Sequence, residues 1–381
     1  MINGVCGIKS TGRICTDLAD ALTEQGHIVK IAYGRDKVPD EYQKYAHRIG
    51  SDIDIRLHGL QSRIFDNTGF GSKKATLRFI EWIKKFDPDV IHLHNLHGYY
   101  INIELLFNYL AKADKRVIWT LHDCWSFTGH CPYFTYAKCD KWKQGCSDCP
   151  QTRSFPTSWI ADNSKNNWKR KKKLFTSVKD MTIVTPSHWL ADLVKQSYLK
   201  KYPVEVIYNG IDTSVFKPTP SSFRKKYGLE DKKILLGVAS VWEKRKGLDD
   251  FIRLSEMLDD SYRIVLIGLS KKQIKNLPGN ILGFTRTNST KGLAQIYTAA
   301  DVFLNLSVEE TFGLTTVEAQ SCGTPAIVYA ASALAEIAPK SAVTPGNLEE
   351  IIKMLNSDIK PDISNEDYGK EAMIKKYCDL Y

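Results

Sequence analysis

Residues 302–318 read VFLNLSVEETFGLTTVE. The apolar start of this stretch favours a buried strand, the middle favours a polar loop, and the part from Gly313 onward favours a helix. Open α/β sheets bind ligands at the carboxyl ends of their strands, which is where this loop lies. The stretch therefore predicts a parallel sheet with a binding loop at its edge.

The same alternation of strand-like runs and helical patterns continues through the whole chain. Helical segments lie between most of the predicted strands, and because the alternation recurs in both halves of the 381 residues, we expect two α/β domains with parallel sheets. The predicted strands are 28–33, 90–94, 117–122, 182–185, 204–208, 234–239, 263–267, 302–306 and 325–329. The predicted helices include 16–25, 75–86, 248–258 and 293–299.

Turn-forming residues indicate where the two domains meet. A linker is expected near 197–203, because a new strand follows it and leads into the turn dipeptide Asn209-Gly210. We predict an N-terminal domain over 1–200 with a cysteine-rich insertion at 124–150. A C-terminal domain over 201–364 is expected to follow, and a final helix over 365–381 is expected to pack back on the first domain.

The loop at 307–318 has the composition of a nucleotide-sugar site. Backbone N–H groups of Gly313, Leu314 and Thr315 open the predicted helix and suit a diphosphate. Glu310 and Glu318 lie on either side and can accept hydrogen bonds from sugar and ribose hydroxyls. The alternative is that both acids are helix caps or surface residues.

A second loop, WEKRKGL at 242–248, follows the predicted strand 234–239. Arg245 and Lys246 are candidates to neutralise the charge that builds up on a leaving diphosphate. An exposed basic loop without a ligand is the alternative.

Two candidates lie in the first half of the chain. His122 ends a predicted strand and would enter a ligand crevice there, although a hydrogen-bonded structural histidine is the alternative. The segment GIKSTGR at 7–13 contains Gly12 and Arg13 ahead of a predicted helix, which suits an anion. It lacks the full spacing of a dinucleotide fingerprint, so a plain strand–helix turn explains it equally well.

Five of the nine cysteines lie between residues 124 and 149. Four of them follow one another in a segment rich in glycine and proline, which suits a closed tetrahedral zinc site: Cys131, Cys139, Cys146 and Cys149. Their spacing is not that of a standard zinc finger. Reduced thiols and a disulfide are the alternatives, the latter disfavoured in the cytoplasm.

The chain carries a net charge of +10, and most of the excess lies in one segment. Residues 160–202 hold ten Lys and Arg against three Asp, a net charge of +7. Trp168, Leu174, Phe175 and Trp189 are interspersed with them, which suggests a basic amphipathic surface for an anionic membrane; a solvated helix face is the alternative. No nucleic-acid motif accompanies the charge. Without a membrane-spanning run or a signal peptide, we expect a cytoplasmic protein, peripheral on the inner face of the membrane.

Taken in chain order, these motifs resemble family 4 of the retaining glycosyltransferases, and the resemblance covers nearly the whole chain. Residues 122–129 (HDCWSFTG), the Ser10–Arg13 segment and the cysteines resemble a branch that builds bacterial capsule, exopolysaccharide or O-antigen units. Val241 stands where the family commonly has an arginine, and Arg245 is the candidate to supply that cation. The matching stretches are 26–29, 186–187, 208–212, 216–218, 246–247, 283–284, 300–302 and the pair Glu310 and Glu318.

The resemblance implies the GT-B architecture, with two Rossmann-like domains facing each other across a cleft. It implies transfer of a sugar from a nucleotide sugar, with UDP as the expected nucleotide, to a saccharide acceptor that is lipid-linked in this branch, with retention and no metal in the chemistry. His122, Glu310, Lys246 and Arg245 would then be catalytic. The donor would contact Gly12, Arg13, Asn209, Phe284, Phe312, Gly313, Leu314, Thr315 and Glu318. A sugar-nucleotide epimerase of the same fold and a non-catalytic basic binding protein are the alternatives.

Overall fold

The computed structural model describes residues 1–362 and 368–381, and it divides the chain into two compact units. Unit 1 comprises Met1–Tyr208 together with Met373–Tyr381, and unit 2 comprises Asn209–Ala372. The division falls a little beyond the predicted limit at residue 200, and 197–203 is not a linker, because the strand that follows it pairs with the sheet of unit 1. The predicted limit between residues 364 and 365 lies outside the described residues.

Unit 1 is built on a seven-stranded sheet in which all neighbouring strands are parallel, in the order β3-β2-β1-β4-β5-β6-β7. Its strands are β1 (Ile2–Asn3), β2 (Ile31–Tyr33), β3 (Ala46–Arg48), β4 (Val90–Leu93), β5 (Arg116–Thr120), β6 (Met181–Thr185) and β7 (Val204–Val206). Its helices are α1 (Lys9–Glu24), α2 (Asp52–Phe65), α3 (Lys73–Phe86), α4 (Ile103–Leu110), α5 (Ser164–Phe175), α6 (His188–Gln196) and most of α14 (Lys370–Cys378).

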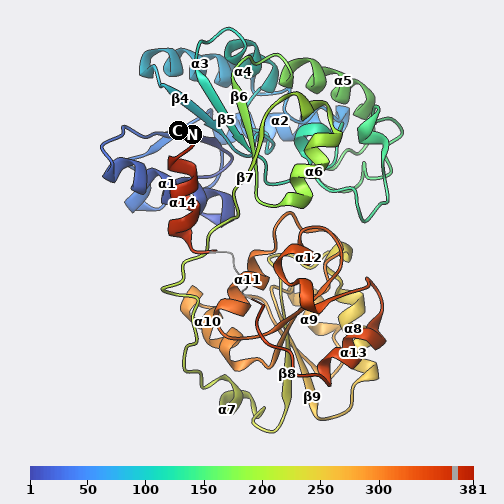
Figure 1. The fold of residues 1–381 in the computed structure, drawn as a ribbon. Helices are drawn as coiled ribbons and strands as arrows, with labels where there is room; N and C mark the ends of the chain where they lie inside the picture. Colours follow the sequence, from blue (N-terminus) through green and yellow to red (C-terminus); the bar gives the residue numbers. More distant parts are fainter. Residues whose placement is uncertain (363–367) are drawn as a thin grey trace. The chain divides into compact units, whose positions relative to one another are not determined.

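Helices cover both faces of this sheet (Figure 1). Successive side chains of a strand point to opposite faces. Trp119 of β5 accordingly joins a core with Phe107 of α4 and Phe175 of α5, whereas Ile118 joins a core with Leu18 of α1. The second core includes Tyr377 of α14, so the end of the chain completes one face of unit 1.

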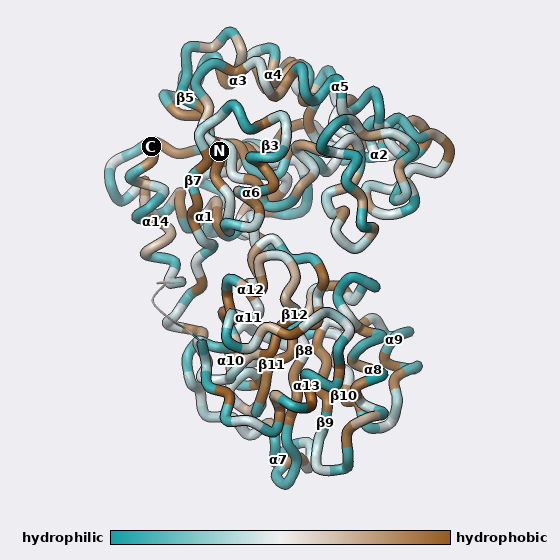
Figure 2. The backbone as a smooth tube through the Cα atoms, turned by 45° about the vertical axis from the view of Figure 1, so that its right-hand side comes forward, coloured by the Kyte–Doolittle hydropathy of each residue, from teal (hydrophilic) through white to brown (hydrophobic). Residues whose placement is uncertain are grey.

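Unit 2 is built on a six-stranded parallel sheet in the order β10-β9-β8-β11-β12-β13. Its strands are β8 (Lys233–Val238), β9 (Tyr262–Ile267), β10 (Ile281–Phe284), β11 (Val302–Asn305), β12 (Ala326–Tyr329) and β13 (Ala342–Val343). Its helices are α7 (Phe223–Tyr227), α8 (Leu248–Met257), α9 (Lys271–Lys275), α10 (Thr290–Ala299), α11 (Leu314–Ser321), α12 (Leu334–Ile337) and α13 (Leu348–Leu355). Figure 2 shows how hydrophobic the central strands β8, β11 and β12 are, as expected for strands buried on both faces.

The strand order of both sheets is that of a Rossmann-like fold. The first three strands are added towards one edge of the sheet, and the fourth strand lies on the other side of the first, so the order of the strands reverses between the first and the fourth. The expectation of two Rossmann-like α/β domains is therefore confirmed. Within the described residues, no helix is both long enough and apolar enough to cross a bilayer.

Candidate active site

The candidate residues of unit 2 gather between β8 and β11, where the order of the strands in the sheet reverses. β8 and β11 are neighbours in the sheet, and the loops at their carboxyl ends carry Lys246 and Glu310. In sheets of this kind the crevice at that point is the usual ligand site. Two loops that are 64 residues apart in the chain are thus brought together at one edge.

Lys246 and Glu310 form an ion pair between these loops, Nζ donating to Oε1, and both side chains are largely buried. Arg245 Nη1 donates to the carbonyl of Glu309 at 3.0 Å, and the Val308 N–H donates to the carbonyl of Arg245 at 3.0 Å. The backbone hydrogen bond joins the two loops, and the side chains of Arg245 and Lys246 each bind the Glu309–Glu310 segment. Together these contacts fix the position of both cations relative to Glu310.

Gly247 shows how closely the two loops approach each other. Its φ is +76°, and a Cβ at this position would lie 2.3 Å from the carbonyl oxygen of Leu306. A side chain here would therefore force the loops apart and displace Lys246. The Gly after the basic run is needed for this contact.

The loop after β12 supports Glu310 from the other side. Ser332 Oγ accepts a hydrogen bond from the Glu310 N–H at 2.8 Å, and the Ala333 N–H donates to the Glu310 carbonyl at 3.2 Å. Glu310 is therefore held by two loops, its backbone by the loop after β12 and its carboxylate by Lys246. Sequence reasoning missed Ser332, and no motif around it would have identified it.

Gly313 caps the N-terminus of α11 with a φ of +102°, so the helix begins at Leu314, as the sequence indicates. Glu318 lies on α11, and its Oε2 accepts a hydrogen bond from Tyr297 Oη of α10 at 2.9 Å. Burial is the main cause that raises the pKa of Tyr297 well above its ordinary value, so this tyrosine stays a neutral donor and orients the carboxylate. Tyr297 was not identified from the sequence.

Three further candidates of unit 2 take mainly structural positions. Phe312 is buried and its ring packs on Tyr368 at 5.9 Å, so its side chain belongs to the core. The carbonyl of Phe284, at the end of β10, accepts from the N–H groups of Gly268 and Leu269 at 2.9 and 3.0 Å. Asn209 is buried at the first position of unit 2.

His122 of unit 1 follows β5 and contacts a second histidine that follows β4. His122 Nε2 and His94 Nδ1 are 3.0 Å apart. Burial lowers the pKa of His122 to about 4, which the nearby Asp123 carboxylate opposes, and burial also lowers the pKa of His94 well below its ordinary value. Both rings are therefore neutral at neutral pH, and one donates to the other.

The same edge of the sheet carries a contact between a histidine and an aspartate that the sequence analysis did not single out. His97 Nε2 lies 2.7 Å from Asp123 Oδ2, and Asp123 Oδ1 accepts from the Trp125 N–H at 2.9 Å. The run HLHNLH at 92–97, which begins within β4 and continues past its end, was the signal that could have identified His94 and His97.

Gly12 and Arg13 do not form a loop ahead of the helix, because α1 begins at Lys9 and contains both. Gly12 lies where the helix passes close to the preceding turn: its carbonyl accepts from the Gly7 N–H at 3.2 Å, and a Cβ would lie 3.0 Å from Val5 Cγ2. Arg13 is exposed and its Nε donates to the Lys9 carbonyl at 3.4 Å. The predicted helix at 16–25 was therefore too short at its start.

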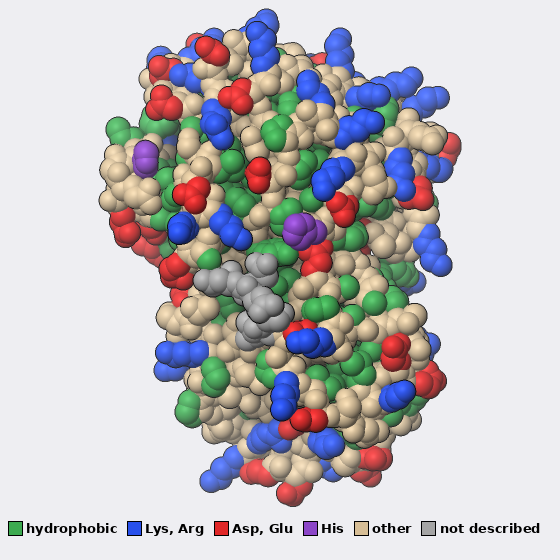
Figure 3. All heavy atoms as spheres, in the orientation of Figure 1, with side chains coloured by type: hydrophobic (Ala, Val, Ile, Leu, Met, Phe, Trp, Pro, Cys, Tyr) green, Lys and Arg blue, Asp and Glu red, His purple; other side chains and the backbone are tan. Residues whose placement is uncertain are grey.

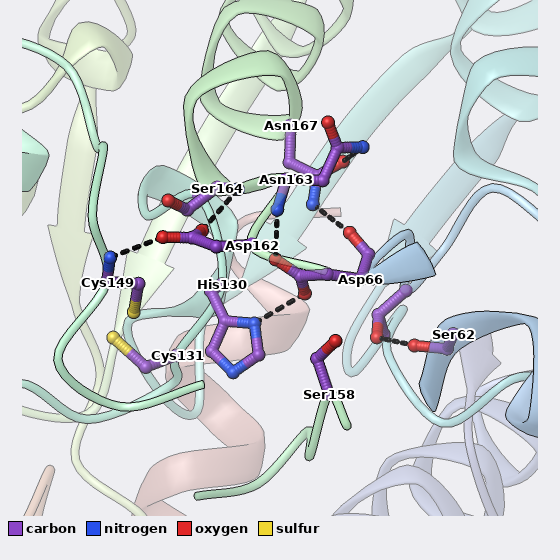
Figure 4. A network of polar contacts seen from close by, with 12 residues as sticks. Ser62, Asp66, His130, Cys131, Cys149, Ser158, Asp162, Asn163, Ser164 and Asn167 are labelled. Carbon is purple, nitrogen blue, oxygen red and sulfur yellow. Dashed lines mark hydrogen bonds and ion pairs between the residues drawn. The ribbon is translucent and has the colours of Figure 1, made fainter. Parts of the chain in front are cut away.

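The cysteine-rich insertion folds against unit 1. Cys131, Cys139, Cys146 and Cys149 line one small pocket together with His130. A thiol hydrogen bond from Cys131 lowers the pKa of Cys149 to about 7. Figure 4 shows these two thiols side by side, with the His130 ring next to them. Over residues 1–362 and 368–381, no three His, Cys, Asp or Glu side chains are already placed to hold one ion.

Comparisons with known proteins agree with this architecture. A model of the family described as Glycosyltransferase Family 4 matches residues 11–215, and a model of Glycosyl transferases group 1 matches residues 221–373. The chain is 25% identical to the "Putative colanic acid biosynthesis glycosyl transferase WcaC" of Escherichia coli (strain K12), over 97% of this chain and 95% of the relative. It is 31% identical to the processive diacylglycerol alpha-glucosyltransferase of Acholeplasma laidlawii, over 38% of this chain and 47% of that protein.

Among solved structures, a sucrose-phosphate synthase from Thermosynechococcus elongatus superposes with a TM-score of 0.68 at 17% identity, covering 99% of this chain and 94% of that chain. Alr3699/HepE of Anabaena in complex with UDP gives a TM-score of 0.67 at 14% identity, covering 100% and 98%. At these identities the likeness concerns the fold. Because the first family model matches more than half of the chain and the second most of the remainder, the chain belongs to Glycosyltransferase Family 4 and is a glycosyltransferase of the GT-B fold.

Proposed function

We propose that this glycosyltransferase moves a sugar, with retention, from a UDP-sugar to a lipid-linked saccharide during synthesis of a cell-surface polysaccharide. The observation that carries the proposal is the Lys246–Glu310 pair, which lies between β8 and β11, where the strand order of the unit 2 sheet reverses. The names of the relatives support the substrates: one is assigned to colanic acid biosynthesis, one acts on diacylglycerol, and one solved neighbour holds UDP. The enzyme would act in the cytoplasm, at the inner face of the membrane.

In this proposal unit 2 binds the donor. The N–H groups of Gly313, Leu314 and Thr315 hold the diphosphate at the start of α11, where the helix dipole favours an anion. Arg245 and Lys246 neutralise the same oxygens. Glu318 accepts the ribose hydroxyls, Glu310 accepts hydroxyls of the transferred sugar, and the backbone at Asn209, Phe284 and Phe312 borders the nucleotide.

Unit 1 binds the acceptor, and His122 contacts the donor sugar, with Gly12 and Arg13 near the phosphates. The bond between the anomeric carbon and the diphosphate oxygen breaks, and the acceptor oxygen forms the new bond on the same face of the sugar. The acceptor proton passes to the departing phosphate oxygen. Because the charge develops on the diphosphate, the fixed cations supply most of the stabilisation.

Nucleotide binding tests the donor assignment. We expect UDP and UDP-sugars to raise the thermal midpoint of the protein, because a ligand that binds only the folded state stabilises it by mass action. GDP and GDP-sugars should have a smaller effect. Glu318→Ala should raise the UDP concentration needed for a given shift by at least about 100-fold, because two charge-assisted hydrogen bonds to the ribose, each worth about 1.5–3 kcal/mol, are lost.

Glu349→Ala, an exposed acid on α13 of the same unit, is the matched control and should leave the shift unchanged. A protein that responds to no nucleotide would contradict the transferase assignment. Product analysis without an acceptor distinguishes the epimerase, which would change the configuration of the donor sugar.

The proposal includes a structural zinc ion held by Cys131, Cys139, Cys146 and Cys149. The shared pocket supports this assignment, as does His130, whose buried Nε2 has no partner while its Nδ1 lies 2.5 Å from Asp66 Oδ1. Metal-binding histidines commonly have such a carboxylate behind them, so His130 can replace one thiolate. Because no three side chains are already placed for one ion among the described residues, binding requires the pocket to contract.

Metal analysis of the purified protein tests this part. We expect about one zinc per chain, released on adding a thiol reagent, and a loss of zinc and of thermal stability in Cys146→Ser. Cys378→Ser, at the other end of unit 1, should keep the metal. Zinc-free protein in which all four thiols react with the reagent at once would establish the reduced-thiol alternative instead.

A further inference from the structure

Helix α2 leaves an apolar stripe facing solvent. Ile53, Leu57 and Leu60 follow one another at helical spacing, and their exposed fractions are 68%, 62% and 47%. Phe65, at the end of the helix, is also exposed, whereas the buried residues of α2 are His58, Gly59 and Ser62. A helix on the surface of a globular protein normally turns its apolar stripe towards the core, and α2 does the opposite.

The loop that follows the cysteine-rich insertion extends this surface. Trp159 and Ile160 are exposed by 49% and 79%, and the Trp159 N–H donates to the Arg63 carbonyl of α2 at 2.6 Å. The Ala161 N–H donates to the Ile64 carbonyl at 3.2 Å. These backbone hydrogen bonds place the loop directly beside the last turn of α2.

A buried polar network holds the helix and the loop together (Figure 4). Asp66 ends α2 in the left-handed conformation, and its carboxylate accepts from the Asn163 N–H at 2.9 Å and contacts the His130 ring. Its carbonyl accepts from Asn167 Nδ2 at 2.5 Å. The apolar surface is therefore preformed, so little conformational entropy is lost when it binds a partner.

Basic side chains border the stripe. Arg56 and Arg63 are exposed on α2, and the Arg63 guanidinium lies 5.5 Å from the centre of the Trp159 ring. The two acids of the helix are at its start, where Asp52 pairs with Arg48 and Asp54 forms the capping box with Ser51. The network at Asp66 includes Asn163, the residue directly before α5. The exposed lysines of α5 are Lys165, Lys169, Lys172 and Lys173.

The structure corrects the origin of the apolar part of this surface. The predicted apolar part consisted of Trp168, Leu174, Phe175 and Trp189. The first three are buried in the core of unit 1, and Trp189 is partly buried against it. α5 therefore contributes charge alone. In Figure 3, Lys and Arg side chains gather over the part of unit 1 that carries α4 and α5 in Figure 1.

We propose that α2 and the 155–160 loop form a docking surface that inserts Ile53, Leu57, Leu60, Trp159 and Ile160 into an anionic lipid bilayer. Tryptophan and arginine together at the border of an apolar patch suit the interface between headgroups and acyl chains. The positive charge that favours anionic lipid also disfavours a second copy of the same surface. The physiological role of docking rests on the proposed function, but binding itself does not.

The surface reaches the edge of the unit 1 sheet where the histidines lie. Phe155, in the same loop, packs on His97 at 5.8 Å between ring centres, and His97 pairs with Asp123. A lipid-linked acceptor could therefore keep its chain in the bilayer while its sugar lies beside His97 and His122.

Sedimentation with vesicles tests the surface. The wild-type protein should bind phosphatidylcholine vesicles that contain phosphatidylglycerol, and bind pure phosphatidylcholine much more weakly. Leu57→Gln combined with Leu60→Gln should reduce the partition coefficient about 100-fold, tenfold for each leucine withdrawn from the acyl layer. Trp159→Ala with Ile160→Ser tests the loop in the same way.

Met257→Gln, an exposed apolar residue of α8 in unit 2, is the control and should bind like the wild type. UDP-induced thermal shifts on every variant report folding and donor binding, so a failed docking surface is distinguished from a failed function. Unchanged vesicle binding in the α2 variant would overturn the proposal. So would concentration-dependent self-association of the wild type that the same variant abolishes, which would assign the surface to a second copy.

Discussion

Lys246→Ala is expected to lower kcat for sugar transfer by about 100- to 1,000-fold, the usual effect of removing one fixed group that stabilises developing charge. Lys246 lies between β8 and β11 of the unit 2 sheet. It is held there by its pair with Glu310 and by the close contact of the neighbouring Gly247 with Leu306. The cation is thus positioned before the diphosphate leaves. Initial rates of UDP release with a saturating donor measure the effect.

Lys244→Ala provides the matched control, because Lys244 lies in the same basic loop but is exposed. Its kcat should remain within about twofold of the wild type, since an exposed charge is screened by solvent. Lys246→Arg should recover part of the rate, because the charge is restored with a different shape. If Lys246→Ala keeps its kcat while only the KM of the donor rises, the lysine binds the ground state and the transition state equally and does not accelerate the chemical step.

The fold could be predicted from the sequence because central parallel strands are buried on both faces. Each predicted strand corresponds to an observed one, from 90–94 (β4) to 325–329 (β12), with shifts at the ends. Of the four strands that were missed, β3, β10 and β13 lie at edges of the two sheets, whereas β1 (Ile2–Asn3) lies inside its sheet but is only two residues long. Edge strands such as Ala46–Arg48 and Ala342–Val343 bury less surface, so their sequences lack a long apolar run.

The candidate site could be predicted only where a motif followed a recognisable strand. Lys246 and Glu310 belong to such loops, and the structure brings them together. Ser332 and Tyr297 support Glu310 and Glu318 from elements that are distant in the chain, and a single serine or tyrosine carries no pattern. The assignment of roles to these residues on the donor remains a prediction.

Charge patterning was the least reliable guide. The basic segment 160–202 has the composition of an amphipathic surface, yet its aromatic residues Trp168 and Phe175 pack inside unit 1. The exposed apolar residues lie on α2, whose sequence DIDIRLHGLQSRIF looks like that of an ordinary surface helix. Which face of an amphipathic helix is covered depends on neighbours that are far away in the sequence.

His58 should make unit 1 sensitive to acid. Its Nε2 accepts hydrogen bonds from the N–H groups of Gly69 and Gly71 at 3.2 and 3.0 Å, and its Nδ1 lies 3.0 Å from Ser72 Oγ. Burial lowers the pKa of His58 from 6.5 to about 4. Between these values the unfolded chain binds a proton that the folded chain does not, so the free energy of unfolding falls as the pH is lowered. The full effect of one such histidine is about 3 kcal/mol.

Urea unfolding at pH 7 and at about pH 4.5, followed by tryptophan fluorescence, measures this contribution. Seven of the eight tryptophans lie in unit 1, so the signal reports mainly on that unit. His58→Gln is the matched variant, because its amide oxygen can accept from the same N–H groups and does not titrate. It should be less stable than the wild type at pH 7 and gain about 2–3 kcal/mol relative to it at the lower pH. Because His92, His94 and His122 remain in both proteins, their titration largely cancels in the comparison. Equal loss of stability in both proteins would mean that another titrating group carries the acid sensitivity.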